Sequence, residues 1–229
     1  MGINYSEHDL LQQVKDYERK VLNRANACIF SSCPKCHCKP HGFKLHEARS
    51  RIFLVIVFNE IQKIISLITR WKCPICGGTS TQYPEFALPY KRYTLPQIID
   101  FISQYLEDDE QTYRKTVTRD NSEFYHAEKS DEEDIPVLAH STLHHWITYF
   151  AKFKGAAKQA LNYINQKDPD TAIFRKIAAL GIPEKKYRSE FRKKILLKCR
   201  ELLCVEREFF RVFNKFFIFP NFATTANWK

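Results

Sequence analysis

The chain has 229 residues, 44% of them hydrophobic, which is enough to bury the core of one large or two small domains. Its charged fraction of 27% is typical of a soluble globular protein, and the lack of a long uncharged apolar run argues against a membrane span. The formal net charge is +10, and residues 152–229 hold 18 Lys and Arg against 7 Asp and Glu, so the surplus in the last third favours a polyanionic partner such as nucleic acid.

Residues 6–27 are predicted to form a helix. Ser6 can cap it, with Asp9 three residues later, and apolar residues recur at helical spacing: Leu10, Val14, Tyr17 and Val21. We interpret this stripe as a packing face, with a contact in a homodimer as the alternative.

Two Cys-x-x-Cys turns dominate the next part of the chain. They are Cys33-Pro34-Lys35-Cys36 and Cys73-Pro74-Ile75-Cys76, and Gly77 follows the second. Paired turns of this kind hold one structural zinc ion between four thiolates, so we predict zinc ligands at Cys33, Cys36, Cys73 and Cys76.

Disulfides and a redox site are the alternatives to a zinc site at these cysteines. Eight cysteines without a secretion signal do not suit the first, and two matched pairs do not suit the second. Four nearby residues remain open as substitute ligands: Cys28, Cys38, His37 and His41.

The segment between the turns is predicted to be a β-hairpin. Residues 51–58 are β-branched and aromatic, Asn59-Glu60 interrupt them, and residues 61–72 resume the pattern. The hairpin returns the chain to the metal, which makes a zinc ribbon whose folding depends on the ion.

Residues 79–93 are predicted to be an extended connector, followed by a helix over residues 95–106 that Thr94 caps. Its inward face consists of Leu95, Ile98, Ile99, Ile102 and Leu106. A shorter helix is expected within residues 108–118. Residues 120–136 are polar and include the acidic run Asp131-Glu132-Glu133-Asp134, which we interpret as a solvated loop.

Residues 141–150 are predicted to form a helix capped by Ser141, with Leu143, Trp146, Ile147 and Phe150 facing inward. The outward side chains are suited to reading bases in a DNA major groove: Thr142, His145, Thr148 and Lys152. Adjacent histidines such as His144 and His145 point about 100° apart on a helix, which argues against a shared metal ion.

This order of features resembles the N-terminal DNA-binding region of insertion-sequence transposases. The resemblance covers residues 33–150: the ribbon, the connector Leu88-Pro89-Tyr90-Lys91-Arg92-Tyr93-Thr94-Leu95, a helix, and the Ser-Thr-Leu-x-x-Trp helix. It is closer still to small zinc-binding helix-turn-helix proteins of bacterial mobile elements. The resemblance implies that the four cysteines are ligands and that Thr142, His145 and Thr148 face DNA. The gap from Thr118 to Ser141 is longer than a helix-turn-helix turn, so the motif has an insertion or its second helix lies elsewhere.

The remaining residues are predicted to form short helices over residues 156–165 and 171–180 and a long amphipathic helix over residues 183–217. Its apolar stripe consists of Tyr187, Phe191, Ile195, Cys199, Leu202, Phe209, Val212 and Phe216. Cations beside the stripe are predicted to contact backbone phosphates: Lys185, Lys186, Arg188, Arg192 and Lys193. A solvated face is the alternative for any single lysine. The apolar end, residues 216–222, should dock on the body or on a partner subunit.

We therefore predict an α+β protein, mainly α, with regions 1–82 (helix and ribbon), 83–152 (helix-turn-helix-like) and 153–229 (basic helices). The expected function is non-enzymatic: sequence-specific binding of double-stranded DNA for a bacterial mobile element, as a transcriptional regulator or as a transposition accessory beside a transposase. The expected location is the cytoplasm, on the nucleoid. The alternatives are a metal-dependent nuclease or recombinase using Asp120, Glu123 and His126, an adaptor subunit of a nucleoprotein complex, and RNA as the ligand.

Overall fold

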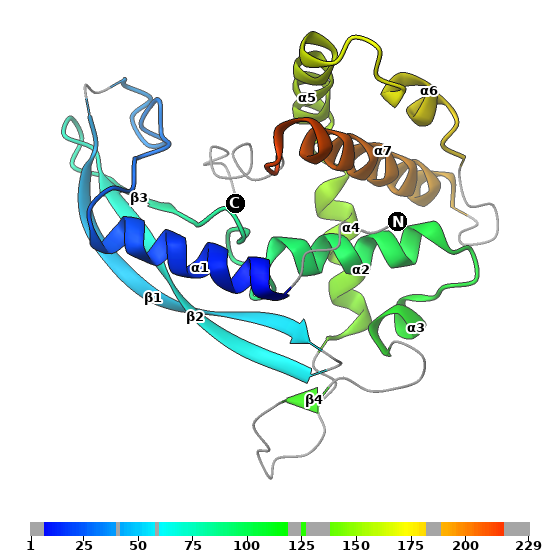
Figure 1. The fold of residues 1–229 in the computed structure, drawn as a ribbon, viewed down its shortest axis with the longest axis horizontal. Helices are drawn as coiled ribbons and strands as arrows, with labels where there is room; N and C mark the ends of the chain where they lie inside the picture. The colour runs from blue at the N-terminus through cyan, green and yellow to red at the C-terminus, as the bar shows by residue number, and fades with distance from the viewer. Residues whose placement is uncertain are drawn as a thin grey trace. The chain divides into compact units, whose positions relative to one another are not determined.

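A computed structural model describes residues 7–39, 42–57, 60–118, 125–126, 138–181 and 189–217. The chain divides into two compact units, shown in Figure 1. We call them the ribbon unit, chiefly residues 4–55 and 62–95, and the helical unit, chiefly residues 56–61 and 96–217. Helices and a small sheet occur together, which confirms the predicted α+β class. Within the described ranges, no helix has both the length and the apolar character needed to cross a membrane.

The ribbon unit contains helix α1 (Glu7–Leu22) and strands β1 (Lys44–Val57), β2 (Glu60–Lys72) and β3 (Thr79–Gln82), in the sheet order β1-β2-β3. β2 and β3 are antiparallel. The predicted hairpin is confirmed, but β1 begins seven residues before the predicted start, and β3 lies in what was expected to be a connector. Beyond this unit, the short strand β4 (Tyr125–His126) pairs in parallel with the start of β2.

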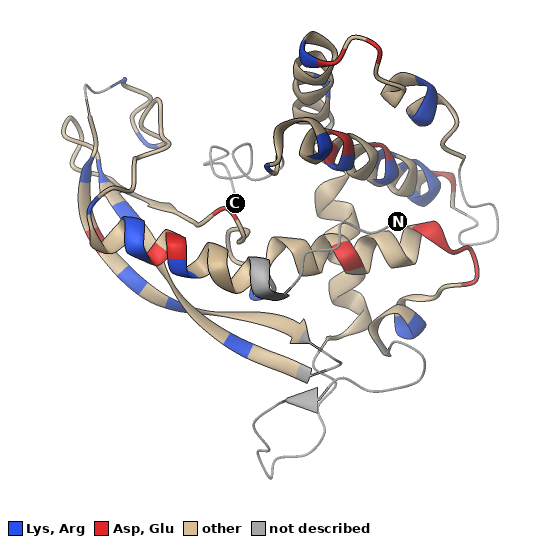
Figure 2. Ribbon diagram, in the orientation of Figure 1, with Lys and Arg blue, Asp and Glu red and all other residues tan. Residues whose placement is uncertain are grey.

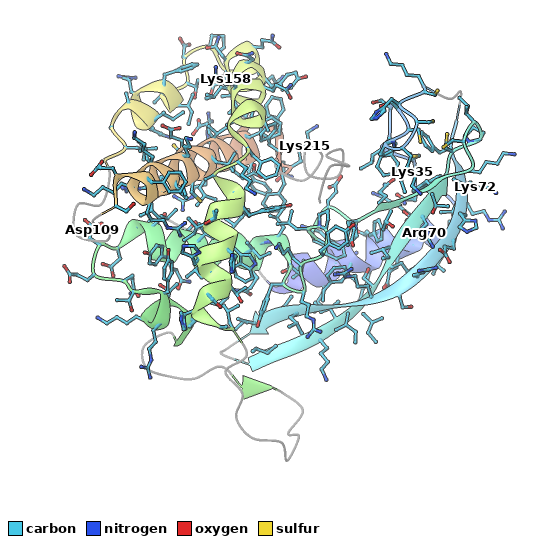
Figure 3. All side chains as sticks on the ribbon, turned by 180° about the vertical axis from the view of Figure 1, so that it is seen from behind. Lys35, Arg70, Lys72, Asp109, Lys158 and Lys215 are labelled. Atoms are coloured by element: carbon cyan, nitrogen blue, oxygen red, sulfur yellow. The ribbon has the colours of Figure 1, made fainter. Side chains whose placement is uncertain are left out.

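Helix α1 lies along one face of the sheet in both Figure 1 and Figure 3. Its predicted packing face is confirmed, because Leu10, Val14 and Val21 are buried. The Tyr17 ring meets Phe86 edge-on at 6.1 Å, and Phe86 contacts Phe53 of β1 at 5.7 Å. This aromatic chain joins helix, connector and sheet in one core.

The helical unit contains α2 (Leu95–Glu107), α3 (Tyr113–Thr118), α4 (His140–Phe150), α5 (Lys154–Lys167), α6 (Ile173–Ala178) and α7 (Glu190–Phe213). Helix α7 contacts α4, α5 and α6, while α3 contacts α4. The rings of Phe101 in α2 and Trp146 in α4 lie 6.2 Å apart. The predicted inward faces of α2 and α4 are confirmed, since every residue assigned to them is buried.

Two predictions in the helical unit are wrong in detail. Helix α4 begins at His140 with Ala139 as its N-cap residue, so Ser141 lies inside the helix and caps nothing. In α7, Phe191 is 75% exposed whereas Arg192 is 6% exposed, so the buried face at the start of the helix is one residue out of step with the predicted stripe. The Arg192 guanidinium is stabilised inside by hydrogen bonds to the hydroxyl groups of Thr148 and Tyr113. At the other end, Phe216 and Phe217 are buried, as expected.

Candidate metal centre and nucleic-acid interface

The two Cys-x-x-Cys turns have the same backbone geometry. In the first, the Cys33 N–H donates to the Cys38 carbonyl at 2.8 Å. In the second, the Cys73 N–H donates to the Gly78 carbonyl at 2.9 Å. Each turn closes on itself and projects two sulfur atoms to one side, which is the arrangement that a closed four-thiolate site requires.

The four predicted ligands converge, with all Sγ atoms within 4.8 Å of one another. Sulfur pairs from opposite turns are 3.7 Å apart (Cys33 and Cys76) and 4.0 Å apart (Cys36 and Cys73). A tetrahedral ion with metal–sulfur bonds of about 2.3 Å requires sulfur atoms about 3.8 Å apart. The donor set and its spacing are therefore suited to a tetrahedral metal ion.

The protonation of these thiols also favours a cation. Burial raises the pKa of Cys33, but backbone N–H groups of Cys36 and Lys35 outweigh burial and lower it to about 7. A backbone N–H of Cys38 lowers the pKa of Cys36, yet burial and the neighbouring Cys33 and Cys76 sulfurs raise it to about 12. Deprotonation of Cys33 is therefore favoured, whereas deprotonation of Cys36 is opposed by the neighbouring sulfur atoms. A cation between the sulfur atoms would stabilise both thiolates.

Three of the substitute ligands considered from the sequence are not part of the four-sulfur group, although the Cys38 side chain hydrogen-bonds the Cys36 thiol. Among the residues that the structure describes, the cluster consists of the four cysteines of the two turns, without Cys28, Cys38 or His37. His41 lies outside the described residues. The four cysteines predicted as ligands are therefore placed so that together they could hold one metal ion.

Both turns contain a residue in the left-handed conformation at the same place. Gly77 has φ 68°, and its counterpart His37 has φ 59°. A side chain in this conformation costs about 1 kcal/mol or more. We expect Gly77→Ala to weaken zinc binding about fivefold or more in a chelator competition, because the loaded turn must take up the strained conformation.

Gly155→Ala is the matched control for this glycine substitution. Gly155 lies in α5, has no neighbour within 4 Å of its Cβ position and does not have a positive φ. Its substitution should leave zinc affinity unchanged and raise thermal stability, because alanine favours a helix. Equal zinc affinity in Gly77→Ala and the wild type would contradict the strain argument.

The predicted base-reading residues of α4 divide into two groups. His145 and Lys152 are exposed and Thr142 is half-buried, so these three remain accessible. Thr148 is turned toward the protein: its hydroxyl donates to the His144 carbonyl at 2.9 Å and accepts from Arg192 at 2.7 Å. Fewer side chains of α4 are therefore available to contact DNA than the sequence predicted.

Arg192 lies in the interior, so the expectation that it faces outward on a basic surface is wrong. Its guanidinium donates to Thr148 of α4, to the Tyr113 hydroxyl of α3 and to the His144 carbonyl. The Tyr113 ring stacks on Tyr105 of α2 at 4.4 Å. Burial and the Arg192 charge lower the pKa of His144, which keeps that imidazole neutral at pH 7. Arg192 thus joins α3, α4 and α7.

Most of the remaining cations of α7 have partners within the helical unit. Lys193 pairs with Glu190 at 2.9 Å, Arg207 with Glu107, and Arg211 with Glu208 at 2.7 Å. Arg200 donates to the Gly181 carbonyl at 2.6 Å. Lys194 and Lys198 are exposed and form no ion pair with a described residue, whereas Arg211 is exposed but paired. The predicted phosphate contacts Lys185, Lys186 and Arg188 lie outside the described residues, as do Asp120 and Glu123 of the nuclease alternative and the side chain of His126.

Comparison with known proteins gives one partial match. Residues 33–120 match the model of a family described as "Domain of unknown function (DUF6431)". No curated protein and no solved structure matches the chain. The matched range begins at the first cysteine of the metal cluster and runs past α3, so the part of the chain that is similar to this family is the paired turns, the sheet, and helices α2 and α3.

Proposed function

We propose that this protein binds double-stranded DNA and that a zinc ion braces its ribbon. The observation that supports this most directly is the four-cysteine cluster, whose spacing suits tetrahedral zinc. Four thiolates leave no open coordination position, so the ion is structural and does not bind substrate. A metal-braced ribbon in a chain of pI about 9.2 is suited to a polyanionic partner.

Helix α4 supplies the groups that would read bases. The accessible side chains are Thr142, His145 and Lys152, and the packing of α3 against α4 supports a helix-turn-helix-like arrangement. The resemblance to proteins of bacterial mobile elements adds the biological role: a transcriptional regulator or an accessory to transposition beside a transposase. This role includes no catalytic step.

Selection from a random pool of duplex oligonucleotides tests the proposal. We expect the zinc-loaded protein to enrich a defined sequence, and its affinity to fall steeply as salt rises, because phosphate contacts release counterions. His145→Ala should relax the preference at one or two base pairs, with a loss of about 1–3 kcal/mol on the preferred site. Failure of the zinc-loaded wild type to bind any duplex would overturn the proposal.

A further inference from the structure

The ribbon carries a surplus of positive charge that an average over the chain conceals. Residues 1–95 hold 14 Lys and Arg against 7 Asp and Glu, whereas residues 96–151 hold 4 against 12. Taken together, residues 1–151 are nearly neutral, which hides a basic ribbon beside an acidic segment. Between Cys33 and Gln82 the sequence has 8 Lys and Arg but only two acidic residues, Glu47 and Glu60.

The arginines of the ribbon are engaged in the sheet itself. Glu47 accepts from Arg49 at 2.9 Å and from Arg70 at 2.5 Å. Arg51 donates to the Tyr83 hydroxyl at 3.1 Å and lies over that ring. Glu47 is therefore already shared by two guanidinium groups.

Four lysines remain beside the metal cluster: Lys35, Lys39, Lys44 and Lys72. We call them the knuckle lysines. All four are exposed, and none forms an ion pair with a described residue. Lys35 lies between two ligands, Lys39 follows the first turn and Lys72 precedes Cys73. The Glu47–Arg70 pair places the start of β1 beside the end of β2, so Lys44 belongs to the same end as Lys72.

The second turn is shaped to hold two of these lysines close. A Cβ atom on Gly78 would lie 2.7 Å from Lys35 Cδ. The Lys35 side chain, which belongs to the first turn, therefore packs against the second turn at a position where glycine has no side chain. Lys72 Cε lies 3.9 Å from the Cβ position of Gly77. Figure 3 shows Lys35 and Lys72 at the same end of the ribbon, and Figure 2 shows the Lys and Arg segments along its strands.

The positive charge of the knuckle lysines is larger than the negative charge that an occupied metal site would have. A divalent ion held by four thiolates carries a net charge of about −2. The four knuckle lysines exceed it and leave the exposed end of the ribbon positive. On α7, by contrast, most described cations are paired with carboxylates or carbonyls of the same unit.

We infer that the knuckle lysines form the principal surface for DNA backbone phosphates, in place of the basic face of α7 predicted from the sequence. This inference rests on the proposed function. Lysine ammonium groups are compact charges with rotatable donors, which suits phosphates approached at varied angles. Because Lys35 and Lys72 lean on the second turn, the metal ion that fixes the turn also fixes the phosphate-binding surface.

The test is a four-lysine variant, Lys35→Gln, Lys39→Gln, Lys44→Gln and Lys72→Gln, in the full chain. Its matched control is Lys15→Gln, Lys20→Gln, Lys158→Gln and Lys167→Gln, which removes the same charge from four exposed helical lysines. A third variant, Lys194→Gln with Lys198→Gln, removes the exposed cations of α7 that form no ion pair with a described residue. Duplex DNA affinity is measured from 50 to 300 mM salt, with zinc content determined on each sample.

We expect the knuckle variant to keep its zinc, to bind every duplex at least about tenfold more weakly, and to lose about 3 to 4 from its salt slope. The helical control and the α7 variant should lose less than about threefold. Equal losses in all variants, a larger loss in the α7 variant, or weaker zinc retention with unchanged DNA affinity would each overturn the inference. A wild type that binds no duplex would overturn the proposed function instead. Preference of the wild type for duplex RNA would replace the partner and count against the DNA assignment.

Discussion

Cys73→Ser is expected to cost the protein its metal and to unfold the ribbon unit while the helices of the other unit persist. Cys73 is fully buried, and its sulfur is one of four that lie within 4.8 Å of one another. Structural zinc supplies about 10 kcal/mol or more to small metal-dependent folds, which is comparable to the whole stability of a domain. Zinc content and the dispersion of amide signals in an NMR spectrum would record both losses.

Cys38→Ser provides the matched control. Cys38 is two residues from a ligand and exposed, and it lies outside the cluster. Its substitution should leave zinc content and the ribbon signals unchanged. Loss of zinc from Cys38→Ser, or full zinc occupancy in Cys73→Ser, would contradict the assignment of ligands. Chelation of the wild type should reproduce the Cys73→Ser spectrum and abolish DNA binding.

The four-cysteine cluster could be predicted from the sequence because its geometry is local. A Cys-Pro-x-Cys turn fixes the directions of its own two sulfurs, so the long-range part of the prediction reduces to one question, whether the two turns meet. The β-branched segment between them answers it, since a hairpin returns the chain to its starting point. The inward faces of α2 and α4 could be predicted for the same reason, because apolar residues at helical spacing mark the buried side of a helix.

The limits of the sheet were harder to predict. The first half of β1 reads Lys44-Leu45-His46-Glu47-Ala48-Arg49-Ser50, which has no apolar alternation, because most of these side chains are exposed. Its strand character comes from pairing with β2, reinforced by the ion pair between Glu47 and Arg70. Strand β3 likewise depends on β2, with Gln82 opposite Thr69. Tertiary partners of this kind leave no periodic signal in the sequence.

The knuckle lysines were missed for a different reason. Over residues 1–151 the basic ribbon and the acidic segment nearly cancel, so the composition of this range gives no sign of a basic surface. Exposure and pairing decide which cations can bind a ligand, and neither can be counted from composition. The cations of α7 illustrate the converse, because a dense basic sequence there is largely committed to carboxylates such as Glu107 and Glu208.

Arg192 shows where hydrophobic periodicity fails. The predicted stripe placed Phe191 inside, but a phenol, a hydroxyl and a carbonyl from two other helices provide acceptors for a guanidinium at the next position. A buried cation with several oxygen acceptors is stable where the same cation without them would not be. The acceptors belong to α3 and α4, far away in sequence, so no pattern within α7 can reveal them.

Arg192→Ala is accordingly expected to destabilise the helical unit by about 2–4 kcal/mol, because it leaves a cavity and removes the donor from the Thr148 and Tyr113 oxygens. Thermal or urea unfolding followed by helical circular dichroism would measure the loss. Arg192→Lys should recover little of it, since a single ammonium cannot reach partners on two helices in the fixed geometry of a guanidinium fork.

Lys193→Ala is the neighbouring control, because Lys193 makes only an exposed pair with Glu190, worth about 0.5 kcal/mol or less. The two substitutions remove the same charge from adjacent positions, so an electrostatic role in DNA binding would affect affinity equally, whereas a structural role separates them in stability. Matching stabilities for Arg192→Ala and Lys193→Ala, with a shared loss of DNA affinity, would return Arg192 to the phosphate-binding surface predicted from the sequence. A large difference in stability would establish it as the residue that holds α3, α4 and α7 together and so keeps His145 and Lys152 presented on a rigid helix.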